Sequence, residues 1–388
     1  MLFPRALLAS AISGTMVLAD SQPEARPLTQ PYYPAAANCW EYKVPVTVTS
    51  QNKVFDFPRW EDDYALQDFL SKATTRDSAN YPSPIVGTKN ETATYTIAAS
   101  FCTPKNGGSK TVILATHGIG QARTHWNSAY RPEEYNFVQH AINQGYSVWF
   151  YDRLGNGESS RVSGFTNQLQ IHKAILVELA KMVKAGQYTG DFGTPEKLAL
   201  MSFSYGSYIT HFTVAENPTI ADAVVLTGIN YNTTGLNFKG LVRSFVPRVA
   251  ALQNPRRFGL LDAGWLTWSD TFAQINTYFK YPFYDIPTSS YAEEYKNAFG
   301  IAEFFTLTDG QFDASGFTGA ALAITGETDY IVCDGECKGI FEEPARTIWK
   351  NAKFTPYLHP NTSHNFFFHK NATASFEVIT SFLKSNEL

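Results

Sequence analysis

The chain has 388 residues, of which 44% are hydrophobic and 15% aromatic, and this is enough material for one large core or two modest ones. A formal net charge of −4 and the lack of any basic run exclude the electrostatic footprint of a nucleic-acid-binding protein. We therefore expect no nucleic-acid partner.

The first residues have the pattern of a secretory signal peptide. Arg5 precedes a mostly apolar stretch over residues 6–18, and a small-x-small sequence at residues 17–19 ends before Asp20. This stretch is shorter than the roughly 18 or more apolar residues that a membrane span requires, and no other run of this kind follows. We expect cleavage after residue 19 and a secreted, extracellular protein without a stable membrane span.

Sequons and cysteines agree with secretion. Asn-x-Ser/Thr sequences, each a possible glycan site, occur at Asn90, Asn232, Asn361 and Asn371. The cysteines form an even set that allows three pairings. We favour Cys39 with Cys102, in segments that look like neighbouring strands, and Cys333 with Cys337, which would close a small loop. A zinc site is disfavoured because Cys333 and Cys337 have no second thiol or histidine pair nearby.

The N-terminal part of the chain predicts two strands separated by a helix. Residues 42–48 and 93–101 alternate and read as strands, and Pro45 favours a sheet edge for the first. Residues 60–72 carry apolar side chains at helical spacing.

From residue 111 the pattern changes to short apolar runs alternating with helices, which is typical of a parallel sheet buried on both faces. Strands are expected in the apolar run from residue 197 and at residues 111–115, 146–151, 221–227, 319–325 and 354–358. Helices are expected at residues 136–144, 169–183 and 205–216 and at the C-terminus, the last with Phe376, Ile379, Phe382 and Leu383 inward. Residues 229–317 break the alternation and are rich in aromatic side chains. They either pack a small core of their own, cover a pocket, or do both.

The run from residue 197 ends in Ser-x-Ser-x-Gly, with Ser202, Ser204 and Gly206, and a helix follows. A serine on a sharp turn between a buried strand and a helix presents its hydroxyl at the sheet edge, where the backbone N–H of Tyr205 would face an oxyanion. Ser202 is a rival nucleophile, but only Ser204 has glycine two residues on.

A serine nucleophile needs a base, and the base needs a carboxylate that fixes its tautomer. Asp329 follows one predicted strand by a short loop, and His364 follows the next. The competing residues are His359 and His369 for the base, and Glu327 and Asp334 for the acid. The three histidines could also be surface residues or a metal patch, but no carboxylates or cysteines converge with them, so we expect no metal.

The order Ser204, Asp329, His364 at the ends of successive strands resembles the α/β-hydrolase superfamily, and the resemblance runs from about residue 111 to the C-terminus. Residues 117–120, His-Gly-Ile-Gly, are similar to the family's oxyanion segment. Residues 152–159 resemble its Asp-x-Arg-Gly-x-Gly-x-Ser loop with one extra residue. Asp152 and His117 are expected to order these loops rather than to react.

The resemblance implies an α/β-hydrolase fold, an oxyanion hole made by the N–H groups of Ile119 and Tyr205, and no cofactor. The spacing from Gly326 to Asp329 is the usual one in the family, which favours Asp329 as the acid. A serine at the elbow argues against epoxide hydrolase or dehalogenase chemistry, because the family runs both with an aspartate there.

Within the superfamily the chain is similar to secreted, capped, esterase-like members of fungi. The expected organisation is a signal peptide at residues 1–19, a hydrolase core at 20–228 and 318–388, and a cap at 229–317. The expected function is cleavage of an ester-type bond in a small or moderately apolar molecule through an acyl-enzyme. An exopeptidase or amidase, a lactonase, and a non-catalytic binding protein remain alternatives, and the sequence does not indicate an oligomeric state.

Overall fold

A computed structural model describes residues 31–231, 236–339 and 342–388. The expected signal peptide and the sequon at Asn232 lie outside these residues. The elements described below all belong to one unit, Tyr32–Leu388.

The core of this unit is an eight-stranded sheet in the order β1-β2-β4-β3-β5-β6-β10-β11. From β4 to β11 all neighbours run parallel, whereas β2 is antiparallel to both β1 and β4. The inner strands are buried on both faces, which explains their continuous apolar runs. The strands are β1 (Ala37–Phe55), β2 (Ile85–Pro104), β3 (Thr111–Thr116), β4 (Ser147–Tyr151), β5 (Lys197–Phe203), β6 (Ala223–Thr227), β10 (Ala320–Gly326) and β11 (Lys353–His359).

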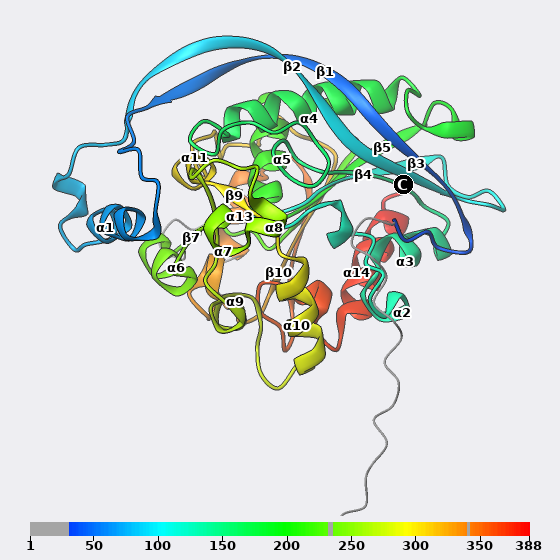
Figure 1. The fold of residues 1–388 in the computed structure, drawn as a ribbon. Coiled ribbons are helices and arrows are strands. Elements are labelled where there is room, and N and C mark those ends of the chain that lie inside the picture. The colour runs from blue at the N-terminus through cyan, green and yellow to red at the C-terminus, as the bar shows by residue number, and fades with distance from the viewer. Residues whose placement is uncertain (1–30, 232–235, 340–341) are drawn as a thin grey trace, which may run out of the picture. The chain divides into compact units, whose positions relative to one another are not determined.

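Helices cover both faces of this sheet, as expected for an α/β fold. In Figure 1, α4 (Leu169–Lys184) and α5 (Tyr205–Glu216) pack together on one side, and α3 (Phe137–Asn143) and α14 (Ala372–Ser385) pack together on the other. The predicted inward side chains of α14 are buried. The remaining helices outside residues 228–319 are α1 (Asp63–Ala73), α2 (Pro132–Tyr135), α12 (Tyr330–Cys333) and α13 (Glu342–Ile348), with single 3₁₀ turns at Ser78–Asn80, Arg123–His125, Gly190–Phe192 and Phe366–Phe368.

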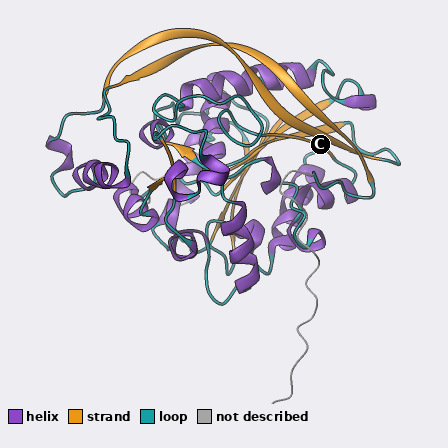
Figure 2. Ribbon diagram, in the orientation of Figure 1, coloured by secondary structure: helices purple, strands orange, loops and turns teal. Residues whose placement is uncertain are grey.

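Strands β1 and β2 form a hairpin much longer than the sequence pattern predicts. Their ladder runs from Ala37 opposite Pro104 to Phe55 opposite Ile85. The extra residues are mostly polar or exposed, so they show no apolar alternation, and backbone pairing is supplemented by polar side-chain contacts such as Thr49 with Thr92 and Lys53 with Asp309. In Figures 1 and 2 the hairpin arches along α4. β1 is the edge strand, as Pro45 predicted.

Local structure sets where two helices begin, and the first of these starts differs from the prediction. Helix α1 starts at Asp63, three residues late, because the Asp62 carboxylate caps it by accepting a hydrogen bond from the N–H of Ala65 at 2.8 Å. Phe366–Phe368 form a separate 3₁₀ turn, and the covering helix α14 begins only at Ala372.

We name residues 228–319, between β6 and β10, the inserted segment. It contains a small antiparallel sheet in the order β7-β8-β9 surrounded by short helices. Its elements are α6 (Phe238–Phe245), β7 (Arg248–Val249), α7 (Ala250–Gln253), α8 (Pro255–Phe258), β8 (Trp265–Thr267), α9 (Thr271–Tyr278), α10 (Ile286–Tyr295), β9 (Phe299–Gly300) and α11 (Ile301–Phe305). Some of its aromatic side chains pack on one another, for example Phe245 on Tyr278 at 5.9 Å between ring centroids.

Among the described helices, none has the length and apolar character needed to cross a membrane. Asn90 and Asn361 are exposed, so their amides are accessible to a modifying enzyme. Asn371 is half-buried, and its Nδ2 donates a hydrogen bond to the carbonyl of Pro360 at 2.9 Å.

Candidate active site

Ser204 lies on the turn between β5 and α5, at the carboxyl edge of the parallel strands. Its φ of 55° and ψ of −123° are unfavourable for a residue with a side chain. The N–H of Ser204 donates to the carbonyl of Thr227 in β6 at 2.8 Å, which holds the turn against the neighbouring strand. A Cβ on Gly206 would stand 2.4 Å from the carbonyl oxygen of Thr116. Only glycine permits this approach of helix and strand.

The structure brings Ser204, His364 and Asp329 into one chain of hydrogen bonds. His364 Nε2 lies 2.8 Å from Ser204 Oγ, and His364 Nδ1 lies 2.6 Å from Asp329 Oδ2. With Nδ1 donating to the carboxylate, Nε2 is free to accept the serine proton. His364 and Asp329 are fully buried, and Ser204 is 8% exposed. This geometry suits transfer of a proton from serine to imidazole.

The loop after β10 fixes the acid. The second oxygen of Asp329, Oδ1, accepts hydrogen bonds from the N–H groups of Ile331 at 2.8 Å and Val332 at 3.1 Å, so the carboxylate also caps helix α12. The Cys333–Cys337 disulfide closes this same loop, and Cys39–Cys102 joins β1 to β2. Both pairings are those favoured from the sequence.

We expect removal of the two disulfides to have opposite effects on kcat and on the melting temperature. Cys333 and Cys337 are four residues apart, so their disulfide restricts the unfolded chain little and adds under about 3 kcal/mol to the free energy of unfolding. Cys39 and Cys102 are 63 residues apart, and their disulfide adds about 4 kcal/mol. Cys333→Ser/Cys337→Ser should therefore lower kcat more than the melting temperature, because a shift of about 1 Å in Asp329 can cost about 10²-fold in rate. Removing Cys39 and Cys102 should do the reverse. Kinetics and thermal melts on both double variants decide this, and an unchanged kcat in the first would contradict it.

The segment after β3 lies against Ser204: a Cβ on Gly118 would stand 2.9 Å from the Cβ of Ser204. Among the described residues, no acceptor pairs with the backbone N–H of Ile119 or of Tyr205, so both remain available. His117 orders this segment, as expected: its Nδ1 bonds the Gly118 carbonyl at 2.9 Å, and its Nε2 accepts from the Arg153 N–H at 2.9 Å. Burial and the nearby Arg153 charge hold the pKa of His117 well below its usual value, so the ring stays neutral.

Asp152 is buried in the loop that follows β4, and backbone N–H groups hold its carboxylate. Its carboxylate accepts hydrogen bonds from the N–H groups of Arg123 at 2.8 Å and Glu158 at 2.9 Å. A Cβ on Gly157 would stand 2.2 Å from this carboxylate, which explains the second glycine of the motif. These contacts support the expectation that Asp152 orders the loop.

A buried ionic cluster, which the sequence analysis missed, joins this loop to the inserted segment. Arg153 pairs with Glu303 of α11, and both side chains are fully buried. His172 of α4 bonds the same carboxylate at 2.9 Å. Arg153 also donates to the carbonyl of Gly118 at 3.2 Å and lies 4.8 Å from the centre of the Tyr205 ring. Burial alone would raise the pKa of Glu303, but the Arg153 charge and the His172 hydrogen bond outweigh it and hold that pKa below its usual value.

The other candidates that the sequence offered for the base, the acid and the nucleophile are not part of this hydrogen-bond chain. His359 Nε2 is 3.2 Å from the carbonyl of Asn371, and His369 Nδ1 is 3.0 Å from that of Asn365. Glu327 and Asp334 accept hydrogen bonds from Asn361 and Asn237 respectively. Ser202 is buried at the end of β5, away from the histidine. In the part of the chain that the structure describes, no group of three or more histidine, cysteine or acidic side chains is arranged to hold a metal.

The model of the family described as "Alpha/beta hydrolase family" matches residues 112–376. The chain belongs to the alpha/beta hydrolase family. The match begins in β3 and ends in α14, so it includes the elbow, the acid loop, the histidine and the inserted segment.

Solved structures of other alpha/beta hydrolases share the fold at low identity. An esterase from Thermogutta terrifontis is 15% identical with a TM-score of 0.53, covering 76% of this chain and 95% of that one. A carboxylesterase structure from Nitrososphaera gargenis is 14% identical, with a TM-score of 0.52 and coverage of 76% and 96%. The enol-lactonase from Burkholderia xenovorans is 14% identical, with a TM-score of 0.51 and coverage of 75% and 97%. Comparison with curated protein sequences found no match.

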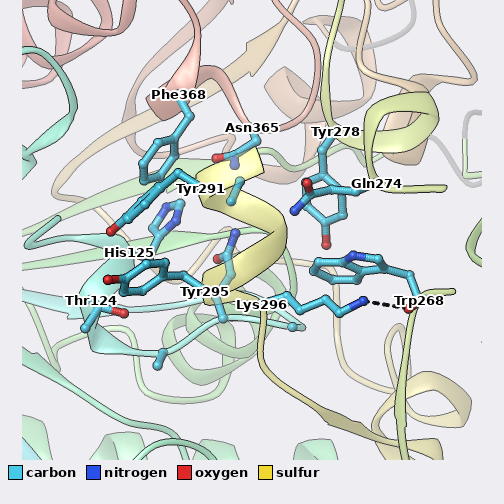
Figure 3. Close-up of a pocket in the computed structure, with 14 residues that line it drawn as sticks. Thr124, His125, Trp268, Gln274, Tyr278, Tyr291, Tyr295, Lys296, Asn365 and Phe368 are labelled. Carbon is cyan, nitrogen blue, oxygen red and sulfur yellow. Dashed lines mark hydrogen bonds between the residues drawn. The ribbon is translucent and has the colours of Figure 1, made fainter. Parts of the chain in front are cut away.

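A pocket in this hydrolase opens beside the triad, between the oxyanion segment and the inserted segment (Figure 3). Its wall includes Gly120, which follows Ile119, and Asn365, which follows His364. The ring of Tyr278 also lines it, with its centroid 5.3 Å from that of His364. Trp268, Tyr278, Tyr291 and Tyr295 of the pocket lie in the stretch that the sequence analysis singled out, whereas Phe368 comes from the 3₁₀ turn before α14. The pocket's polar members, such as Gln274, carry no sequence signal, because only the folded chain brings them to the triad.

Proposed function

We propose that this chain is a serine hydrolase that cleaves ester bonds in a small or moderately apolar substrate. The observation that carries the proposal is the unbroken chain from Ser204 Oγ through His364 to the buried Asp329, with contacts of 2.8 and 2.6 Å. The N–H groups of Ile119 and Tyr205, which have no acceptor among the described residues, support it, because Tyr205 follows the serine and Gly118, next to Ile119, lies against it.

In the proposed reaction Ser204 Oγ attacks the carbonyl carbon while its proton passes to His364 Nε2. Asp329 stabilises the imidazolium, and the Ile119 and Tyr205 N–H groups bind the oxyanion. His364 then protonates the departing alcohol as the ester bond breaks, which leaves an acyl-enzyme. Water, deprotonated by His364, attacks the acyl carbon and releases the acid and the free serine.

We further propose that residues 229–317 act as a cap that lines the substrate site, and that the chain is secreted after loss of residues 1–19. Tyr278 and Trp268, both from this stretch, lie on the pocket beside the triad, which supports a cap. The two disulfides support an oxidising compartment.

Amide cleavage by an exopeptidase is less well supported. Such an enzyme needs a free carboxylate to anchor the substrate's amine. Four of the acidic residues available in the inserted segment already have partners: Asp262 accepts from the Gly264 N–H, Asp270 caps α9, Asp285 pairs with Arg131, and Glu293 pairs with Lys296.

Covalent labelling tests the proposal. A fluorophosphonate ester should add once to the intact protein, with the adduct on Ser204 by peptide mapping. A panel of esters, lactones and aminoacyl amides should then show ester turnover. A protein that takes no label and turns over no member of the panel would be a binding protein on this fold, and the proposal would fail.

A further inference from the structure

Three polar side chains that line the pocket beside the triad each carry an atom without a hydrogen-bond partner among the described residues. His125, Gln274 and Asn365 are only 6%, 3% and 4% exposed. The unpaired atoms are His125 Nε2, Gln274 Oε1 and Asn365 Oδ1, and each has almost no exposed surface of its own. A buried polar atom left unpaired destabilises the fold. The side chains that carry these atoms line one cavity next to Ser204, so small rotations of the imidazole and of the two amides would let a ligand there pair with them.

The chemistry of these groups restricts the ligand to a neutral one. Burial, with a smaller contribution from His364, lowers the pKa of His125 to about 3, so its ring is uncharged at neutral pH. Gln274 and Asn365 are neutral amides. The ammonium of Lys296 also lines the pocket, but it is paired with Glu293 Oε1 at 2.5 Å and with the Trp268 carbonyl at 3.0 Å. No charge is left unpaired for an ionic substrate group.

Each amide carries an acceptor oxygen and a donor NH₂ group, so a ligand group that both donates and accepts suits them. An uncharged O–H group does both, and its oxygen can also accept from a neutral histidine ring. A plain alkyl group would leave all three side chains unpaired. Sites built to hydrogen-bond a hydroxyl discriminate strongly against analogues that lack it.

The walls and the size of the pocket define what carries this hydroxyl. In Figure 3 the rings of Tyr291, Tyr295 and Phe368 lie on one side and Trp268 and Tyr278 on the other, with the Gln274 and Asn365 amides beside the space between them. The cavity volume is about 40 Å³, space for only a few water molecules. It therefore admits one small or flat hydroxyl-bearing group rather than a long chain.

We propose that this pocket selects esters that carry a neutral hydroxyl close to the scissile bond, with the Gln274 and Asn365 amides and the His125 ring turning to hydrogen-bond with it. The inference rests on the proposed ester hydrolysis. Asn365 adjoins His364 in the chain and Gly120 adjoins Ile119, so a bound hydroxyl would stand within a few bonds of the reacting carbonyl.

Two matched substrate pairs test this on the parent protein. Methyl 3-hydroxypropanoate against methyl butanoate places the hydroxyl in the acyl part, and 2-hydroxyethyl butyrate against propyl butyrate places it in the alcohol part. We expect at least one hydroxylated ester to have a kcat/KM about tenfold or more above that of its partner. The pair that responds identifies the side of the ester that enters the pocket. Equal kcat/KM values within both pairs would overturn the inference while leaving ester hydrolysis intact, whereas no turnover of any ester would contradict the proposed function itself.

Variants then assign the preference to the pocket. Gln274→Leu and Asn365→Leu should each bring the ratio of the two kcat/KM values toward one. The matched control is Asn276→Leu, two residues along α9 on its exposed side, which should keep the parent ratio. A preference that survives in both pocket variants, with thermal melts showing that they are folded, would show that the pocket holds only water and would refute the assignment.

Discussion

Replacing Ser204 with alanine is expected to abolish ester hydrolysis and phosphonate labelling while leaving the fold intact. Ser204 Oγ lies 2.8 Å from His364 Nε2 and is the proposed nucleophile. Removing a triad nucleophile costs about 10⁶-fold in kcat. Steady-state kinetics on the best ester of the panel measure the loss, and circular dichroism with a thermal melt checks the fold.

Ser202→Ala is the matched control for this variant. Ser202 lies two residues earlier on the same strand, is fully buried, and does not bond His364. We expect it to keep labelling and turnover near those of the parent. Loss of labelling in Ser202→Ala together with its survival in Ser204→Ala would reverse the assignment of the nucleophile.

The second large effect is expected for Asp329→Asn. The substitution keeps the shape and the acceptor at Oδ1 that caps α12. An amide placed toward His364 Nδ1, however, no longer enforces the tautomer in which Nε2 accepts a proton. Wrong-tautomer variants lose about 10⁴-fold in kcat. The loss should appear in the acylation step, measured as the rate of phosphonate labelling, as well as in turnover.

Glu327→Gln and Asp334→Asn are the controls for the acid, since both side chains lie near Asp329 in the sequence but do not contact His364. Each should retain most of the activity. If Asp329→Asn kept nearly all of its activity while one of the controls lost most of its own, the acid would have been misassigned.

The sequence was sufficient for the parallel core and for the three residues that the structure joins in one hydrogen-bond chain. Strands that are buried on both faces are apolar along their length. The sequence therefore shows a continuous apolar run for each of the strands β3, β5, β6 and β10. Parallel strands end at one edge, and Ser204, Asp329 and His364 follow three such ends.

The parts that were not predicted depend on contacts across the fold. The outer half of the β1–β2 hairpin is held by backbone pairing and by polar side-chain contacts, such as that of Lys53 with Asp309, and neither leaves an apolar alternation in the sequence. Glu303 is one acidic residue between apolar neighbours in Ile301–Phe305, and its partners Arg153 and His172 are more than 130 residues away. Gln274 meets Asn365 at the pocket only because the inserted segment folds back over the core.

The Arg153–Glu303–His172 cluster also limits how freely this family member could exchange its insertion for another. Glu303 is the carboxylate that neutralises Arg153, and Arg153 holds the carbonyl of Gly118 next to Ile119, one of the two proposed oxyanion donors. Removing one partner from a buried ion pair costs about 3–5 kcal/mol, because the remaining charge has no counterpart. A core from which residues 229–317 had been removed would keep Ser204, Asp329 and His364. Its Arg153 side chain, next to Gly118, would have lost the Glu303 carboxylate that neutralises it. The insertion is not an interchangeable module: any replacement would have to bring an acidic side chain to the position that Glu303 occupies.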